Sequence, residues 1–178
     1  MAMRRAVFLD RDGVINASVV REGKPYPPAN VGELEILTGV PQALSSLKQA
    51  GFLLIVVSNQ PDVARGTTSR ATVEAINRTL GDQLPIDEFM MCYHDSGDGC
   101  VCRKPRPGML LDAAARWSIE LSASCMVGDR WRDVEAGTNA GCKTIFIDYG
   151  YAEKQPTHAD CRVRSLTEAV PYILSLPS

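Results

Sequence analysis

The sequence lacks the apolar run of about 20 residues that a membrane-spanning helix requires. It also lacks a strong excess of either charge: the formal net charge is −2 at pH 7, and aromatic residues make up only 6% of the chain. Proteins whose main partner is a nucleic acid usually present basic surfaces with aromatic side chains among them. The basic start from Met1 to Arg5 leads directly into a strand pattern, not into the apolar core of a signal peptide. We therefore expect a cytoplasmic protein with neither a membrane nor a nucleic-acid partner.

Internal repeats, low-complexity tracts and long linkers are also absent from the sequence. The 178 residues are 45% hydrophobic and 22% charged, which is ordinary for a globular protein that buries one core. No insertion after Asn16 or after Ser58 is long enough to form a separate domain. We expect residues 1–178 to form a single domain without a cap domain, and a monomer.

Short apolar runs alternate along the chain with stretches of helical pattern. Strands are predicted over residues 6–9, 52–57, 89–93, 125–127 and 144–147, and helices over residues 41–50, 69–81, 107–117, 132–140 and 167–176. A repeated strand–helix–strand order is typical of a parallel sheet with helices on both faces. The predicted fold is therefore α/β, a three-layer Rossmann-like sheet. Residues 17–40 are predicted to be irregular, and Pro171 to weaken the last helix or shift its start.

The first predicted strand ends abruptly at two aspartates, Asp10 and Asp12, with Gly13 directly after them. Carboxylates at the carboxyl end of a buried strand stand where open α/β sheets bind their ligands. They suit Mg²⁺, which prefers oxygen ligands, and an aspartate carboxylate can also accept a phosphoryl group. By itself, the motif is equally compatible with a strand that ends in a polar turn.

Three further polar clusters follow the predicted strands and loops. They are Ser58-Asn59-Gln60, Arg103-Lys104 and Gly128-Asp129. Because the loops at one edge of a parallel sheet converge, we expect these clusters to meet Asp10 and Asp12 in one crevice. Taken singly, each has a plainer interpretation: a turn residue for Ser58, a solvated side chain for Lys104 and a helix cap for Asp129.

Four soft metal ligands lie close together in the loop over residues 92–102. Cys92 and His94 are separated by one residue, and so are Cys100 and Cys102. Three sulfurs and one imidazole suit a closed tetrahedral Zn²⁺ site, which would have a structural role. The alternative is a group of free thiols beside an exposed histidine.

The ordered motifs over residues 6 to about 150 resemble the haloacid dehalogenase superfamily of phosphohydrolases. The four matching segments are Asp10-Arg11-Asp12-Gly13-Val14, Ser58, Lys104 and Gly128-Asp129-Arg130-Trp131-Arg132-Asp133. The resemblance implies that Asp10 is the nucleophile that forms an aspartyl phosphate, and that Asp12 is the general acid and base. It implies that Ser58 and Lys104 hold the phosphoryl group. Mg²⁺ would be bound by Asp10, the Asp12 backbone carbonyl and Asp129.

The zinc loop and the junction Cys102-Arg103-Lys104-Pro105 resemble one branch of that superfamily. The branch contains the D-glycero-D-manno-heptose-1,7-bisphosphate 7-phosphatases and the histidinol-phosphate phosphatases. The resemblance implies a small sugar phosphate as substrate, with removal of the C7 phosphate during synthesis of nucleotide-activated heptose for the lipopolysaccharide core. Histidinol phosphate is the alternative substrate. A non-catalytic, zinc-stabilised binding module is the alternative from another class of protein.

The same resemblance implies a set of substrate contacts, with Arg103 favouring the second phosphate. They are Asn16, Asn59, Gln60, Arg65, Arg103 and Arg130. The role of Asp133 stays open between a contact to the metal through water and the orientation of Arg130.

Overall fold

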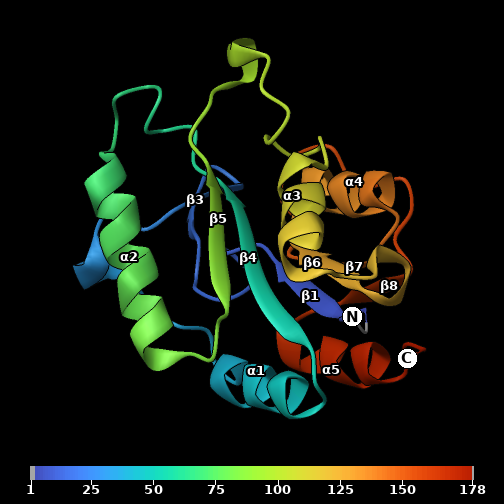
Figure 1. The fold of residues 1–178 in the computed structure, drawn as a ribbon. Coiled ribbons are helices and arrows are strands. Elements are labelled where there is room, and N and C mark those ends of the chain that lie inside the picture. Colours follow the sequence, from blue (N-terminus) through green and yellow to red (C-terminus); the bar gives the residue numbers. More distant parts are fainter. Residues whose placement is uncertain (1–2, 178) are drawn as a thin grey trace.

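The computed structural model describes residues 3–177, and a six-stranded parallel sheet forms its centre (Figure 1). The strands are β1 (Ala6–Leu9), β2 (Val19–Arg21), β3 (Lys24–Tyr26), β4 (Leu53–Asn59), β5 (Glu88–Cys92), β6 (Cys125–Gly128), β7 (Lys143–Ile147) and β8 (Cys161–Val163). The helices are α1 (Val40–Gln49), α2 (Arg70–Gln83), α3 (Gly108–Trp117), α4 (Trp131–Ala140) and α5 (Leu166–Leu174), with short 3₁₀ turns at Val31–Glu33, Ser96–Asp98 and Leu121–Ala123. The sheet order is β5-β4-β1-β6-β7-β8, while β2 and β3 form a separate hairpin.

Alternate residues of the strands fill two hydrophobic clusters, one on each face of the sheet. Val7 and Leu9 belong to the cluster that includes α1, α2 and α5. Ala6 and Phe8 belong to the cluster that includes α3 and α4. Figure 1 shows α2 and α3 on opposite sides of β4 and β5. Burial on both faces explains why the strands are continuous apolar runs, and the predicted three-layer α/β fold is confirmed.

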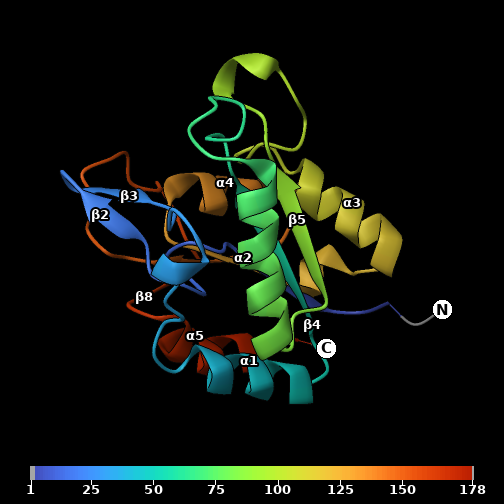
Figure 2. The same ribbon diagram turned by 90° about the vertical axis from the view of Figure 1, so that its left-hand side faces the viewer.

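The central strand β1 directs the chain to the edge of the sheet where polar residues gather. It pairs with β4 on one side and β6 on the other, so the strand order reverses at β1. The Asp10 amide still donates to the Val127 carbonyl at 3.0 Å, and the chain leaves the sheet there. Such a switch point is where open α/β sheets form a ligand crevice. The loop that follows β5 rises above the same edge, and hairpin β2–β3 stands beside it (Figure 2).

The prediction that residues 17–40 are irregular was wrong in part, because they contain hairpin β2–β3. Glu22 and Gly23, both with positive φ (49° and 73°), form its two-residue turn. Pro25 pairs with Val20, one step beyond the pair next to the turn, where no ladder N–H is needed. The proline therefore interrupts no hydrogen bond, although it made the segment resemble a loop.

The carboxyl-terminal part also differs from the prediction. Strand β8 at the edge of the sheet has only three residues and was missed. Helix α5 begins at Leu166 under a Ser165 cap and continues through Pro171. Within residues 3–177, none of the helices has both the length and the apolar character needed to cross a bilayer.

Candidate active site

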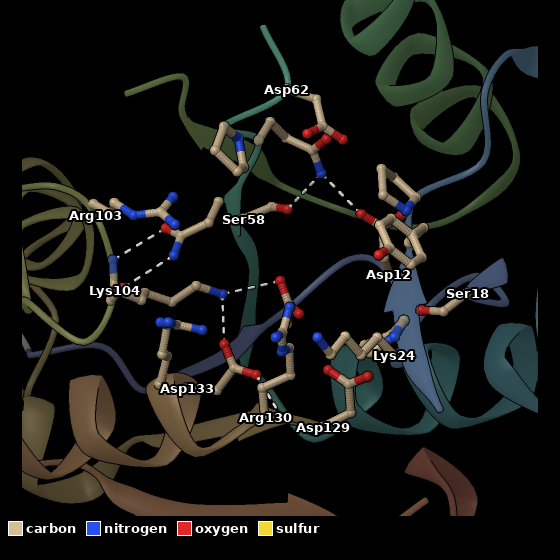
Figure 3. A pocket seen from close by; sticks show the side chains of 18 of the residues that line it. Asp12, Ser18, Lys24, Ser58, Asp62, Arg103, Lys104, Asp129, Arg130 and Asp133 are labelled. Atoms are coloured by element: carbon tan, nitrogen blue, oxygen red, sulfur yellow. Dashed lines mark hydrogen bonds and ion pairs between the residues drawn. The ribbon is translucent and has the colours of Figure 1, made fainter. Parts of the chain in front are cut away.

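The carboxyl ends of β1, β4 and β6 and the loops around them enclose a cavity of about 320 Å³ (Figure 3). Hairpin β2–β3 and the start of α4 also contribute to its wall. The charged side chains that line it are Asp10, Asp12, Asp62, Asp129, Asp133, Lys24, Arg65, Arg103, Lys104, Arg130 and Arg132. The four polar segments that were expected to converge therefore lie around one cavity, because parallel strands bring their carboxyl ends to the same edge.

Lys104 connects two of these carboxylates. Its Nζ lies 2.9 Å from Asp10 Oδ1 and 2.7 Å from Asp133 Oδ1, and it donates to the Val57 carbonyl at 2.7 Å. The residue is only 2% exposed, so its charge needs partners in the protein. Burial opposes that charge, but Asp10 and Asp133 hold the pKa of Lys104 above its ordinary value. The lysine is therefore a fixed positive charge beside Asp10.

Three carboxylates lie close to one another here, and two of them contact this lysine. Asp10, Asp129 and Asp133 present oxygens that all lie within 4.8 Å of one another. Burial raises the pKa of Asp10 to about 6, with Asp133 adding to the rise and Lys104 opposing it. Burial, and then the charges of Asp10 and Asp133, likewise raise the pKa of Asp129 well above its usual value. A further positive charge would relieve this repulsion and favour the ionised forms of Asp10 and Asp129.

The surroundings of Asp129 indicate whether that positive charge can be a metal ion. Its Oδ2 accepts from the Tyr151 hydroxyl at 2.9 Å, whereas Oδ1 is buried without a hydrogen-bond partner in residues 3–177. A buried carboxylate oxygen without a partner is costly unless a ligand meets it. The donors here are oxygens, which suit Mg²⁺. Gly13 allows the backbone after β1 to lie close to Asp129. At its φ of +88°, an added Cβ would lie 2.0 Å from Asp129 Oδ2.

Asp12 is oriented by donors on both of its oxygens. Arg11 donates to Oδ1 and Oδ2 at 3.2 and 3.3 Å, Asn16 to Oδ1 at 3.0 Å and Gln60 to Oδ2 at 2.8 Å. Arg11 is fully buried and is itself held by Asn77 Oδ1 at 2.9 Å. Asp12 therefore has a set position on the cavity wall. Sequence reasoning gave Arg11 no role, since a single arginine between two motif aspartates carries no distinct signal.

The strand β4 delivers Ser58, Asn59 and Gln60 to the cavity wall. The Ser58 hydroxyl is buried and accepts from Gln60 Nε2 at 3.0 Å. Asn59 makes a reciprocal pair with the Lys104 backbone, donating to its carbonyl and accepting from its amide at 3.0 Å each. Asn59 thereby fixes the loop that carries the buried lysine.

The remaining predicted substrate residues have different surroundings. Asn16 is fully buried and is not among the cavity-lining residues, which favours orientation of Asp12 over direct contact with a substrate. Arg65 pairs with Asp95 at 2.7 Å and with Asp62 at 3.5 Å. Arg103 lines the cavity and donates to the His94 carbonyl at 3.3 Å.

Arg130 is matched by a carboxylate that the sequence analysis did not single out. Its guanidinium donates to both oxygens of Glu153, one of them at 2.9 Å. In the described part of the chain, Arg103 and Arg132 have no such ion pair, although both line the cavity. The positive charge available to an anionic ligand is therefore greater at Arg103 and Arg132 than at Arg130.

Asp133 closes the network from the start of α4. Its Oδ2 accepts from the Arg130 amide at 3.0 Å, and its Oδ1 contacts Lys104 at 2.7 Å. The carboxylate thus caps the helix and holds the lysine at the same time.

The loop after β5 brings its three sulfurs and one imidazole together. Cys92 Sγ lies 3.8 Å from Cys100 Sγ and 3.2 Å from Cys102 Sγ, and His94 Nδ1 lies 3.5 and 3.3 Å from Cys92 and Cys102. A tetrahedral Zn²⁺ with ordinary bond lengths would separate sulfurs by about 3.8 Å, and sulfur from nitrogen by about 3.5 Å. The donor set suits zinc, and three of these four distances lie within about 0.2 Å of those values, while the Cys92–Cys102 distance is shorter.

Comparisons with known proteins agree with this geometry. The family model described as HAD-hydrolase-like matches residues 101–169. The D-glycero-beta-D-manno-heptose-1,7-bisphosphate 7-phosphatase of Bordetella bronchiseptica is 36% identical over 155 residues, covering 84% of each chain. The enzyme of the same name from Escherichia coli K12 is 38% identical over 154 residues, covering 79% of this chain and 78% of its own. The chain belongs to the heptose-bisphosphate phosphatase family.

A solved structure from this family supports the assignment at the level of the fold. The D,D-heptose 1,7-bisphosphate phosphatase of B. bronchiseptica, complexed with magnesium and phosphate, has a TM-score of 0.77 and 31% identity. The match covers 96% of this chain and 98% of that one. The resemblance to the haloacid dehalogenase superfamily is thus confirmed, and the protein is a phosphatase of the heptose-bisphosphate phosphatase family. That result favours an enzyme over a non-catalytic binding module.

Proposed function

We propose that this phosphatase removes the C7 phosphate of D-glycero-D-manno-heptose 1,7-bisphosphate in a Mg²⁺-dependent reaction through an aspartyl phosphate. The observation that carries the proposal is the contact of Lys104 Nζ with Asp10 Oδ1 at 2.9 Å, in the cavity that also holds the unpartnered Asp129 Oδ1. A nucleophile, a fixed positive charge and a free metal ligand therefore share one site. The names of the relatives support the heptose substrate over histidinol phosphate.

In the first half of the reaction, the Asp10 carboxylate attacks phosphorus as the bond between phosphorus and the sugar oxygen breaks. Asp12 gives its proton to that oxygen, so the sugar leaves as an alcohol. Lys104 supplies a fixed positive charge beside the phosphoryl group during the transfer, and the Ser58 hydroxyl holds one of its oxygens. The donors Arg11, Asn16 and Gln60 keep Asp12 in place on the cavity wall.

In the second half, a water molecule attacks the phosphorus of the aspartyl phosphate. Asp12, now ionised, takes a proton from that water, and the bond between phosphorus and the Asp10 oxygen breaks. Inorganic phosphate leaves, and both carboxyl groups return to their starting protonation states. Two displacements replace one direct hydrolysis of a phosphomonoester, which is extremely slow without catalysis.

Two metal ions fit separate parts of the protein. Asp10, Asp129 and the Asp12 backbone carbonyl would hold Mg²⁺, which supplies positive charge to the phosphoryl oxygens and keeps Asp10 ionised when bound. The magnesium and phosphate in the B. bronchiseptica relative support this choice of metal. Cys92, His94, Cys100 and Cys102 would hold a structural Zn²⁺, since four protein ligands leave no open position for chemistry.

The second phosphate of the substrate would be bound at the mouth of the cavity by Arg103 and Arg132. Both guanidiniums line the cavity, and neither has an ion pair in residues 3–177. Arg130, proposed from the sequence, has part of its charge neutralised by Glu153. Arginine suits this task because its planar group binds phosphate oxygens in pairs and is always charged.

A panel of phosphate esters tests the substrate. We expect kcat/KM for heptose 1,7-bisphosphate to exceed that for p-nitrophenyl phosphate and histidinol phosphate, with heptose 1-phosphate as the product by ³¹P NMR. Asp10→Asn should lower kcat by at least about a thousandfold. If heptose bisphosphate is no better than p-nitrophenyl phosphate, the substrate proposal is wrong while the reaction class stands. If heptose bisphosphate is the preferred substrate, its consumption in extracts would support a place for the enzyme in the synthesis of activated heptose.

A further inference from the structure

The segment that follows β7, residues 148–153, contacts three segments around the site: the turn after β1, hairpin β2–β3 and the loop between β6 and α4. The Tyr149 hydroxyl donates to the Gly13 carbonyl, and the Tyr151 hydroxyl donates to Asp129 Oδ2, each at 2.9 Å. The Ala152 amide donates to the Gly23 carbonyl in hairpin β2–β3, also at 2.9 Å. Glu153 forms the ion pair with Arg130. The four donors and acceptors on this segment, Tyr149, Tyr151, Ala152 and Glu153, lie outside the motifs found in the sequence.

The contact between Tyr151 and Asp129 gives the two oxygens of one carboxylate different surroundings. Oδ2 is held by the hydroxyl, and Oδ1 is left buried and unpartnered. A carboxylate held at one oxygen cannot rotate freely, so its other oxygen keeps one direction. Tyr151 does not line the cavity of about 320 Å³ and lies in the wall of a neighbouring cavity, so its hydroxyl reaches the site through Asp129.

The Tyr151 ring is itself supported, which makes the hydroxyl a rigid donor. It stacks on the Tyr149 ring with centroids 5.5 Å apart and planes inclined by 29°. The next residue, Ala152, is fastened to the hairpin by its backbone amide. A donor that is fixed on two sides loses little conformational entropy when it orients a neighbouring group.

We propose that Tyr151 is a positioning residue for the divalent cation: its hydroxyl fixes Asp129 so that Oδ1 is presented to the metal. This inference rests on the Mg²⁺ site of the proposed function. Tyr149 supports the ring, but its hydroxyl donates to the Gly13 carbonyl and makes no hydrogen bond to Asp129 within residues 3–177, so the two tyrosines have different roles within one stack.

The test is Tyr151→Phe, which keeps the ring and its stacking and removes only the hydroxyl. Binding is measured on zinc-loaded, substrate-free protein by electron paramagnetic resonance of free Mn²⁺, with Mg²⁺ as competitor. Loss of a partner behind a metal ligand weakens metal binding by about 10- to 100-fold, and we expect a change of that size. In turnover, the Mg²⁺ concentration for half-maximal rate should rise by the same factor, while kcat recovers at saturating Mg²⁺.

Tyr149→Phe is the matched control. It removes a hydroxyl from the same pair of stacked rings, but that hydroxyl contacts the Gly13 backbone carbonyl. We expect its Mn²⁺ affinity to stay within about twofold of the wild type. Unchanged affinity in Tyr151→Phe would overturn the inference, as would equal weakening in both variants or a lower kcat that Mg²⁺ does not restore. Failure of the wild type to bind Mn²⁺ or Mg²⁺ would instead overturn the proposed metal site, and the inference with it.

Discussion

Replacing Lys104 by methionine is the most informative perturbation of this site. Methionine fills much of the space of the lysine stem but leaves Asp10 and Asp133 without the cation that contacts both. Lys104 is 2% exposed, so solvent cannot take its place without rearrangement of the site. We expect the variant to lose phosphatase activity and, in the absence of Mg²⁺, a large part of its stability.

The magnitude follows from the burial of the two ion pairs. Removing one partner of a buried pair typically costs about 3–5 kcal/mol in the free energy of unfolding. For a domain of this size, each kcal/mol corresponds to about 2–4 °C in Tm, so the expected loss is roughly 6–20 °C.

The loss of stability in Lys104→Met should also depend on pH. The pKa of Asp10 determines whether this loss grows or shrinks as the pH falls. This pKa is raised to about 6 with Lys104 present, and Lys104 opposes the rise. Without the lysine the pKa rises further, so the folded variant binds protons more readily than the unfolded chain does. Its stability relative to the wild type should therefore improve as the pH falls from 8 to 5.5.

The assay is thermal and urea unfolding of zinc-loaded, Mg²⁺-free protein, with variant and wild type compared at each pH. Lys48→Met is the matched control, because Lys48 forms an ion pair with Asp87 while 39% of its side chain is exposed. Exposed pairs contribute at most about 1 kcal/mol. A loss in Lys104→Met no greater than in this control, or a loss that grows on acidification, would refute the reasoning.

Three further predictions concern the neighbouring groups. Gly13→Ala would place a methyl group 2.0 Å from Asp129 Oδ2 at a φ of +88°; we expect urea unfolding to show a loss of about 1–3 kcal/mol, and wild-type stability would contradict this. Arg132→Gln should raise KM for the bisphosphate about tenfold and more than Arg130→Gln does; steady-state kinetics with the opposite order would contradict the charge argument. Metal analysis should find about one zinc per chain, lost with a fall in Tm in Cys102→Ser; freshly purified, reduced wild type without zinc would contradict it.

The sequence was sufficient to predict the fold and the convergence of the main polar residues. Burial on both faces makes the central strands continuous apolar runs, and glycines end two of the predicted helices, so these elements carry strong local signals. A parallel sheet then brings the carboxyl ends of its strands together without further information. Asp10, Ser58, Lys104 and Asp129 consequently line one cavity, as the order of the motifs indicated.

Local patterns could not predict the short elements outside the sheet core. Hairpin β2–β3 has three residues in each strand, partly exposed, and contains Pro25, so neither alternation nor β-propensity marks it. Strand β8 has only three residues and lies at the edge of the sheet. It is stabilised by pairing with β7, and its own residues show no strand pattern long enough to recognise.

The sequence by itself determined the order of the motifs, and with it the family, the sheet and the polar side chains at one edge of that sheet. The tertiary structure alone decided which partners those side chains have. Glu153 forms an ion pair with Arg130, Asn16 donates to Asp12, and Tyr151 donates to one oxygen of Asp129. The physical reason is that charge compensation and hydrogen-bond satisfaction depend on distances between segments far apart in the chain. No spacing of residues along the sequence encodes those distances.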